Sequence, residues 1–190
     1  MPNAFVFPGG VISKEDFSSS WIDLFKNSGH NQDDLDALVL DGVDRPLLME
    51  KASLDEVVSR DIAVRLAAIR ETFEESGILV TKSDSANAMA HSFSSIEELS
   101  DWRTKVHKDP GQLCALYKSL GLVPDLWSLK EWSCWLTPTD LHEQGKRRFD
   151  TLFYTTSLDS IPDILLDNQV QFVQIFFLTF CTILYIPGGN

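Results

Sequence analysis

The run from Arg70 to Ile78, Arg-Glu-Thr-Phe-Glu-Glu-Ser-Gly-Ile, constrains the fold more than any other stretch of the chain. At about 100° per residue, a helix here places Glu71, Glu74 and Glu75 within an arc of roughly 100°. An apolar stripe points in the opposite direction, as in a helix that packs on a core, and it consists of Ile62, Leu66, Ile69 and Phe73. Gly77 is expected to end the helix, because glycine readily adopts the left-handed conformation found after helix C-termini.

Three carboxylates close together at the end of a helix are electrostatically unfavourable. Like charges three or four residues apart destabilise a helix by roughly 0.2–0.5 kcal/mol per pair. Carboxylates in the last turn also face the negative end of the helix dipole, at a cost of about 0.3–1 kcal/mol each. A solvated acidic face is one interpretation of this cluster. The other is a cation site, because hard oxygen ligands suit Mg²⁺ or Mn²⁺, and the spacing alone leaves both open.

The same residues resemble the second half of the Nudix box, Arg-Glu-U-x-Glu-Glu-x-Gly-U, in which U is apolar and Thr72 departs at one position. The first half, Gly-x5-Glu, is similar to a segment that begins at Phe7-Pro8-Gly9-Gly10, with Asp16 where the motif has glutamate. Asp16 and Arg70 lie 54 positions apart instead of eight, so an insertion of 46 residues divides the box.

A divided box of this kind resembles the acyl-coenzyme A diphosphatase branch of the Nudix hydrolase superfamily (nucleoside diphosphate-linked moiety X motif 19). Two later stretches agree with that branch: Trp132–Pro138 and Arg147–Thr151. The likeness covers roughly residues 2–166. It implies an α/β (α+β) fold, a Nudix α/β/α sandwich with a mixed sheet and a helical insertion within the box. Nudix folds place further strands before the one expected at Ala4–Phe7, so we expect a chain shortened at its N-terminus.

The predicted organisation is one Nudix domain over residues 1–168 and an apolar, non-homologous tail over residues 169–190. Within the domain we expect the insertion at about 14–56 and a mainly helical segment at about 92–130. The expected helices are an amphipathic one containing Phe17–Phe25, one from a capping box at Ser53 to Ser76, one that starts near Ser95, and Leu113–Leu120. The expected strands after the acidic helix are Ile78–Val80, Trp132–Leu136 and Phe149–Thr155.

The resemblance implies a hydrolase that acts on acid anhydrides. Coenzyme A and acyl-coenzyme A would be cleaved at the diphosphate to adenosine 3′,5′-bisphosphate and (acyl-)4′-phosphopantetheine, with Mg²⁺ or Mn²⁺ as cofactor. The implied metal ligands are Glu71, Glu74, Glu75 and the backbone carbonyl of Gly10. Arg70 completes the catalytic set and is expected to hold a glutamate rather than the substrate. Two alternatives remain: a Nudix pyrophosphatase on another dinucleotide such as NADH, and an inactive module with a binding or membrane-associated role.

Substrate contacts are less constrained by the sequence. Arg147 and Arg148, in the densest basic cluster, are the candidate contacts with the additional phosphate of coenzyme A, and solvated loop charge is the alternative. Trp132 and Trp135 could stack on adenine, but we expect them to pack in the core or half-buried on a strand.

Composition limits the partners and the compartment. The net charge of −12 and the pI near 4.6 argue against a nucleic-acid surface, because phosphate binding by proteins needs clustered lysine and arginine. A small anionic substrate is compatible with this charge when a cation offsets it locally. The three cysteines lack metal-type spacing and indicate a reduced, intracellular protein. The family resemblance adds the peroxisome or mitochondrion as a location, although no targeting signal is visible.

The tail contains a mostly apolar run from Val170 to Ile186. A helix needs about 20 apolar residues to span a bilayer, and this run has 17. Membrane association through residues 170–186 is therefore possible in principle but not favoured. We expect instead a final strand followed by non-homologous sequence.

Overall fold

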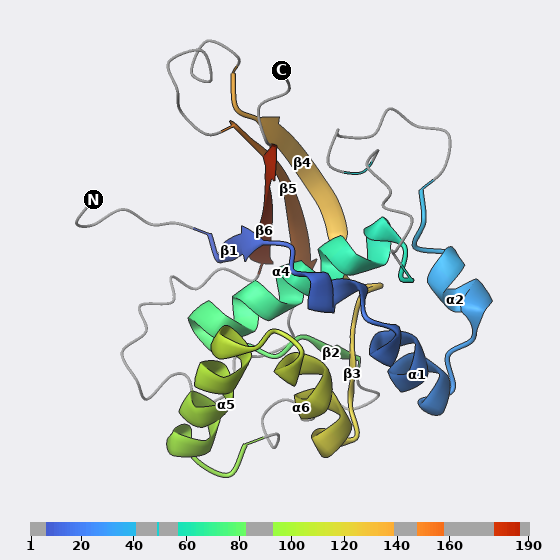
Figure 1. Cartoon of the computed structure of the whole chain (residues 1–190), viewed down its shortest axis with the longest axis vertical. Coiled ribbons are helices and arrows are strands. Elements are labelled where there is room, and N and C mark those ends of the chain that lie inside the picture. Colours follow the sequence, from blue (N-terminus) through green and yellow to red (C-terminus); the bar gives the residue numbers. More distant parts are fainter. Residues whose placement is uncertain are drawn as a thin grey trace.

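A computed structural model of the chain describes residues 7–40, 49, 57–82, 93–138, 148–157 and, for the backbone, 177–186. The elements in chain order are β1 (Gly9–Val11), the 3-10 turn η1 (Lys14–Phe17), α1 (Ser19–Asn27), α2 (Gln32–Asp36), α4 (Arg60–Ser76), β2 (Thr81–Lys82), α5 (Ile96–Lys108), α6 (Gln112–Leu120), β3 (Val123–Pro124), β4 (Lys130–Leu136), β5 (Arg148–Ser157) and β6 (Phe177–Ile186) (Figure 1).

The main sheet has the strand order β1-β6-β5-β4. β1 runs parallel to β6, whereas β6, β5 and β4 pair antiparallel. The sheet is therefore mixed, and the expected α/β fold is confirmed. Along β5, alternate residues from Asp150 to Thr156 are buried while those between them are half-buried, so one face of this strand is covered more completely. The described residues supply one helical layer of the expected sandwich.

Helix α4 lies at the centre of this arrangement, between the sheet and the helices α5, α6 and α1 (Figure 1). The apolar stripe predicted for it is buried, but so is every other position from Asp61 to Arg70. A helix buried around most of its circumference is part of a core rather than a surface cover. Gly77, with φ of 78°, ends α4 as expected, and its N–H bonds to the Phe73 carbonyl at 2.9 Å.

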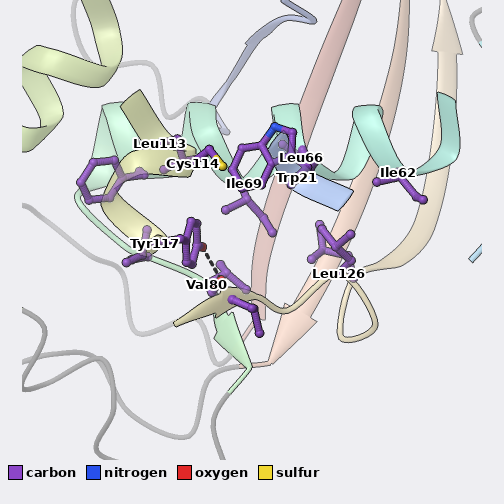
Figure 2. Close-up of a cluster of buried hydrophobic side chains, with 14 of the residues drawn as sticks. Trp21, Ile62, Leu66, Ile69, Val80, Leu113, Cys114, Tyr117 and Leu126 are labelled. Carbon is purple, nitrogen blue, oxygen red and sulfur yellow. Dashed lines mark hydrogen bonds between the residues drawn. The ribbon is translucent and has the colours of Figure 1, made fainter. Parts of the chain in front are cut away.

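Beneath α4, side chains from several elements form the main hydrophobic cluster. Figure 2 shows Trp21 of α1, Ile69 of α4 and Tyr117 of α6 meeting in this cluster. The rings of Trp21 and Tyr117 pack edge to face, with centroids 6.2 Å apart. The buried Tyr117 hydroxyl donates a hydrogen bond of 2.6 Å to the Val80 carbonyl. This bond ties α6 to the segment that leaves α4.

Two predicted elements differ in the structure. The acidic helix begins at Arg60, with Ser59 at the N-cap position, and the capping box expected at Ser53 lies outside the described residues. Ile78–Val80 is buried but joins no strand of the main sheet. The strand that follows it is β2, which pairs with β3 in a separate two-stranded sheet. The strand predicted at Ile78–Val80 is therefore wrong, because an apolar run indicates burial but does not specify which strand would supply the hydrogen bonds.

The expected tail contributes to the sheet. Its described part, β6, lies between β1 and β5, and it pairs Gly9 with Cys181 and Phe153 with the same residue on the other side. The final strand expected in the tail is present as β6, and the domain boundary at residue 168 stays a prediction. Within the described residues, no helix is long and apolar enough to cross a membrane.

Candidate active site

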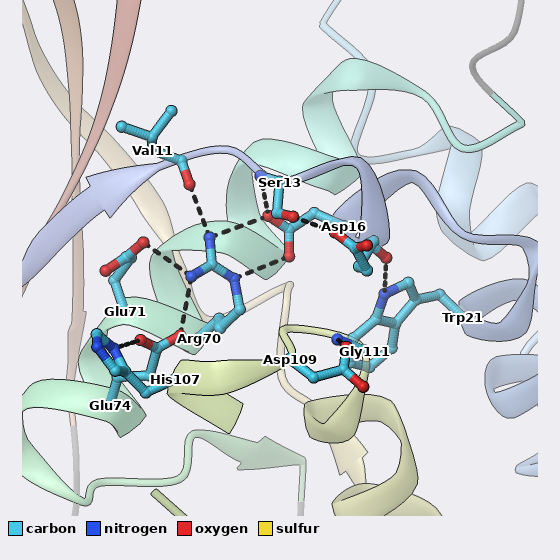
Figure 3. Close-up of polar contacts among 11 residues, drawn as sticks. Val11, Ser13, Asp16, Trp21, Arg70, Glu71, Glu74, His107, Asp109 and Gly111 are labelled. Carbon is cyan, nitrogen blue, oxygen red and sulfur yellow. Dashed lines mark hydrogen bonds and ion pairs between the residues drawn. The ribbon is translucent and has the colours of Figure 1, made fainter. Parts of the chain in front are cut away.

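The two halves of the divided motif meet at Arg70. Its Nε and Nη2 atoms donate to the two carboxylate oxygens of Asp16, each at 3.1 Å. Nη2 also donates to the Val11 carbonyl at 2.8 Å, and the Ser13 N–H donates to Asp16 at 2.8 Å. Figure 3 shows Asp16 and Val11 on one side of the guanidinium and the carboxylates of α4 on the other. The two residues that flank the insertion in the motif, Asp16 and Arg70, thus form a buried ion pair.

On the opposite side, Arg70 Nη1 bonds to Oε1 of Glu71 at 2.8 Å and to Oε1 of Glu74 at 2.9 Å. The positive charge of Arg70 therefore offsets part of the negative charge of this carboxylate cluster. Burial alone would lower the pKa of the Arg70 guanidinium. The charges and hydrogen bonds of Asp16, Glu71 and Glu74 together raise that pKa, so Arg70 stays positively charged.

Gly9 and Gly10, which the sequence placed in a turn, begin strand β1 and lie directly against the carboxylates. A Cβ atom on Gly10 would overlap the carboxylate of Glu71, so only glycine leaves room for that side chain. The Gly9 N–H donates to the Glu75 carboxylate. These two glycines and the two carboxylates are more than 60 positions apart in the sequence, and the fold brings them into contact.

The pKa values of Glu71 and Glu75 are raised above the ordinary value of a glutamate. Burial is the main cause for Glu71, and the charges of Glu74 and Glu75 add to it while Arg70 opposes it. Burial also raises the pKa of Glu75, with a further contribution from Glu74, against the hydrogen bond from Gly9. In both groups the ionised form is destabilised, mainly by burial, and a bound cation would stabilise it.

Residues of α5 face these carboxylates and line the other side of the site. Arg103 donates from Nε and Nη2 to the Glu74 carbonyl, at 3.0 and 2.8 Å, and from Nη2 to the Glu75 carbonyl at 2.8 Å. The His107 ring is 2.8 Å from the second carboxylate oxygen of Glu74 (Figure 3). Between α4 and α5 is a cavity of about 410 Å³, which is within the usual size range of ligand sites. Its lining residues are Glu71, Glu74, Glu75, Ser100, Arg103, Thr104 and His107.

The sequence did not identify the residues of α5 as part of the site. No motif contains Arg103 or His107, and both lie about 30 positions after the residues that they contact. The only available signal was their spacing, because the four α5 residues that line the cavity follow the pattern i, i+3, i+4, i+7 and so share one helix face.

The carboxylates are compatible with a divalent cation but do not enclose one. Among the described residues, no group of three or more histidine, cysteine, aspartate or glutamate side chains is arranged to surround a metal ion. Their oxygen donors are nevertheless the type that hard cations prefer. The raised pKa values of Glu71 and Glu75 and the side-chain-free Gly10 also fit such an ion.

The predicted substrate contacts are not gathered at this cavity. Arg147 lies outside the described residues, and Arg148 is described only as the first residue of β5, where it pairs with Ile186. The expectation that Trp132 and Trp135 pack in the core or half-buried is wrong, because they are 62% and 69% exposed. Both lie on β4, which forms the end of the sheet order, and the pairing with β5 shifts between Glu131 and Ser133.

Comparison with known proteins supplies an independent line of evidence. The family model described as the NUDT19 Nudix domain matches residues 1–180. The chain is 38% identical to the acyl-coenzyme A diphosphatase NUDT19 of Xenopus laevis over 177 residues, which covers 89% of this chain and 47% of the relative. Proteins of the same name from Gallus gallus and Homo sapiens are 37% and 32% identical, over 85% and 88% of this chain and 46% and 47% of their own lengths. The chain thus spans about half the length of these curated relatives. No solved structure matches the chain significantly.

Proposed function

This chain belongs to the NUDT19 Nudix domain family, and on that premise we propose that it hydrolyses the diphosphate bond of coenzyme A and acyl-coenzyme A. Water would add across the P–O–P linkage, giving adenosine 3′,5′-bisphosphate and (acyl-)4′-phosphopantetheine. One observation carries the proposal: the two glycines of β1, the Asp16–Arg70 pair and the carboxylates of α4 converge although 46 residues separate the two halves of the motif.

Nudix hydrolases in general use divalent cations, and we propose Mg²⁺ or Mn²⁺ here. Glu71, Glu74, Glu75 and the backbone carbonyl of Gly10 would hold the ion. When bound, such a cation polarises phosphoryl oxygens and makes a water molecule a stronger nucleophile. The donor set supports this choice, because all four groups are hard oxygen ligands.

The protein's own contribution is to hold these ligands in place. Arg70 holds Glu71 and Glu74 from one side, and Asp16 holds Arg70 in turn. Glu74 is held at both carboxylate oxygens, by Arg70 at one and by His107 at the other. A carboxylate fixed in this way loses little conformational entropy when it binds a ligand, which is the advantage of preorganisation.

The substrate assignment is supported by the relatives named acyl-coenzyme A diphosphatase. Arg147 and Arg148 remain the candidate contacts with the additional phosphate of coenzyme A. The exposure of Trp132 and Trp135 makes them accessible to a ligand.

A turnover assay with a matched pair of variants tests the proposal. The purified chain is incubated with Mg²⁺ and coenzyme A, NADH or a nucleoside triphosphate, and the products are resolved by chromatography. We expect cleavage of coenzyme A, loss of that cleavage in Glu74→Gln, and wild-type rates in Glu97→Gln, which removes a fully exposed carboxylate from α5. Cleavage confined to NADH would favour the dinucleotide alternative. Equal residual rates in the wild type and Glu74→Gln would favour an inactive module.

A further inference from the structure

The α4 side of the cavity is lined by three carboxylates, whereas the α5 side is lined by one face of that helix. An anionic substrate therefore needs a positively charged partner in the cavity. Among the described residues, Arg103 is the only lysine or arginine in the lining. A diphosphate must approach three carboxylates, so a cation on the opposite wall would offset part of their repulsion.

Arg70 cannot serve this purpose. A guanidinium has five N–H donors, and Arg70 uses all of them. Two donate to Asp16, one to Val11, one to Glu71 and one to Glu74. Its side chain is also buried, with 3% of the residue exposed. A substrate contact by Arg70 would require breaking a bond inside the site.

Arg103 differs from Arg70 in both respects. It is partly exposed, and its hydrogen bonds come from Nε and Nη2, so that Nη1 has no partner among the described residues. Those bonds fix the guanidinium to the Glu74 and Glu75 carbonyls at the end of α4. The same helix end is already capped by Gly77, whose N–H bonds to the Phe73 carbonyl. Gly77 thus satisfies a different carbonyl from the two that Arg103 bonds.

From this geometry we propose that Arg103 is a substrate-binding residue, whose Nη1 donates to a phosphate oxygen of the scissile diphosphate while Nε and Nη2 stay bonded to α4. The identity of the substrate rests on the function proposed above. The planar fork suits this double role, because it can bond in two directions at once without changing its rotamer. Arg103 would thereby fix the distance between the bound diphosphate and the carboxylates of α4.

Three variants separate substrate binding from a purely structural role. Arg103→Gln removes the charge, Arg103→Lys keeps the charge without the fork, and Lys108→Gln removes one exposed charge from the same helix outside the cavity lining. For each protein we would measure kcat and KM for coenzyme A, the Kd of ADP in excess Mg²⁺ by calorimetry, and Tm. ADP is the probe because it carries a diphosphate without the pantetheine portion.

We expect Arg103→Gln to raise both KM and the Kd of ADP about tenfold or more, which corresponds to loss of one charge-assisted hydrogen bond. Arg103→Lys should lie between the wild type and Arg103→Gln, and Lys108→Gln should match the wild type. A structural role alone would lower Tm or kcat and leave KM and Kd within twofold, and that result overturns the inference.

The two readouts also separate this inference from the proposed function. If the wild type binds ADP but does not cleave coenzyme A, the proposed reaction fails, and the Kd of Arg103→Gln still decides the role of Arg103. If the wild type cleaves coenzyme A and Arg103→Gln does so with an unchanged KM, only the inference fails. A folded wild type that neither cleaves coenzyme A nor binds ADP overturns both.

Discussion

The Arg70 guanidinium holds the Asp16 carboxylate through two hydrogen bonds of 3.1 Å, and the two residues are 54 positions apart in the chain. Both side chains are almost completely buried. The pair connects the start of the insertion to the middle of α4. Its stability therefore determines whether the two halves of the divided motif stay together.

Replacing Asp16 by asparagine leaves a buried arginine without its main counter-charge. Loss of one partner from a buried ion pair costs about 3–5 kcal/mol of unfolding free energy, and we expect a loss of this size in urea unfolding. Asp101→Asn on α5 is the control, because Asp101 is exposed and such changes usually stay within about 0.5 kcal/mol. A loss below about 1 kcal/mol for Asp16→Asn would show that the pair contributes little.

Replacing Gly10 by alanine introduces a Cβ atom where the Glu71 carboxylate now lies. The carboxylate is the far end of a flexible side chain, so it can move aside and the fold should lose less than about 1 kcal/mol of stability. Moving it breaks its bond with Arg70, and we therefore expect weaker Mn²⁺ binding by calorimetry and slower turnover of coenzyme A.

Gly111→Ala is the control for this change. Gly111 has φ of −63°, and the atom nearest to an added Cβ is 3.3 Å away, so alanine fits with only a small adjustment. Unchanged Mn²⁺ binding in Gly10→Ala would mean that Glu71 is not a metal ligand.

Replacing Tyr117 by phenylalanine removes the hydroxyl that donates to the Val80 carbonyl. The Val80 carbonyl keeps a longer bond of 3.3 Å from the Asp125 N–H, so we expect the loss of one hydrogen bond, about 0.5–1.5 kcal/mol. Thermal or urea unfolding measures this loss. Ser119→Ala, which removes a hydroxyl from the exposed side of α6, should change stability by no more than about 0.5 kcal/mol. Equal effects of the two substitutions would contradict the role assigned to Tyr117.

The Cys134 thiol should react slowly with alkylating reagents, although Cys134 is an exposed residue of β4. Its Sγ is 3.1 Å from Oδ1 of the buried Asp150. Desolvation, the hydrogen bond with Asp150, and the charges of Asp150 and Glu131 raise the pKa of Cys134 from 9.0 to about 12. Since the thiolate is the nucleophile, alkylation by iodoacetamide near pH 9 should be much slower in the folded protein than in urea. Peptide mass spectrometry can follow Cys134 separately, and equal rates in both states would contradict the raised pKa.

The same shift predicts a pH dependence of stability. The folded state holds the Cys134 proton to a higher pH than the unfolded state does. Its contribution to stability is therefore fully present below the ordinary value of 9.0 and declines as the pH rises towards about 12. Stability should therefore decline less in Cys134→Ser than in the wild type, which unfolding experiments on both sides of pH 9 would measure; burial also raises the pKa values of Cys114 and Tyr117, so part of the decline remains.

Local sequence patterns predicted most elements correctly. The spacing of apolar residues located α1, α4 and α6, Ser95 caps α5 as expected, and the strands around Trp132 and Leu152 are present as β4 and β5. These patterns are local because side chains one helical turn or two strand positions apart must face the same way. They failed where partners were distant, since nothing in Ile78–Val80 specifies the strand beside it and nothing in Trp132 shows that β4 ends the sheet order.

By itself, the sequence determined the divided motif and the placement of three carboxylates on one face of a helix, because a periodicity of 3.6 residues and a run of nine residues suffice for both. Only the tertiary structure decided that Asp16 is the partner of Arg70, that Gly10 lies against Glu71, and that Arg103 and His107 face the carboxylates from α5. The physical reason is that these contacts depend on how α4 packs against β1 and α5, and packing between elements distant in the chain has no periodicity that a single sequence reveals.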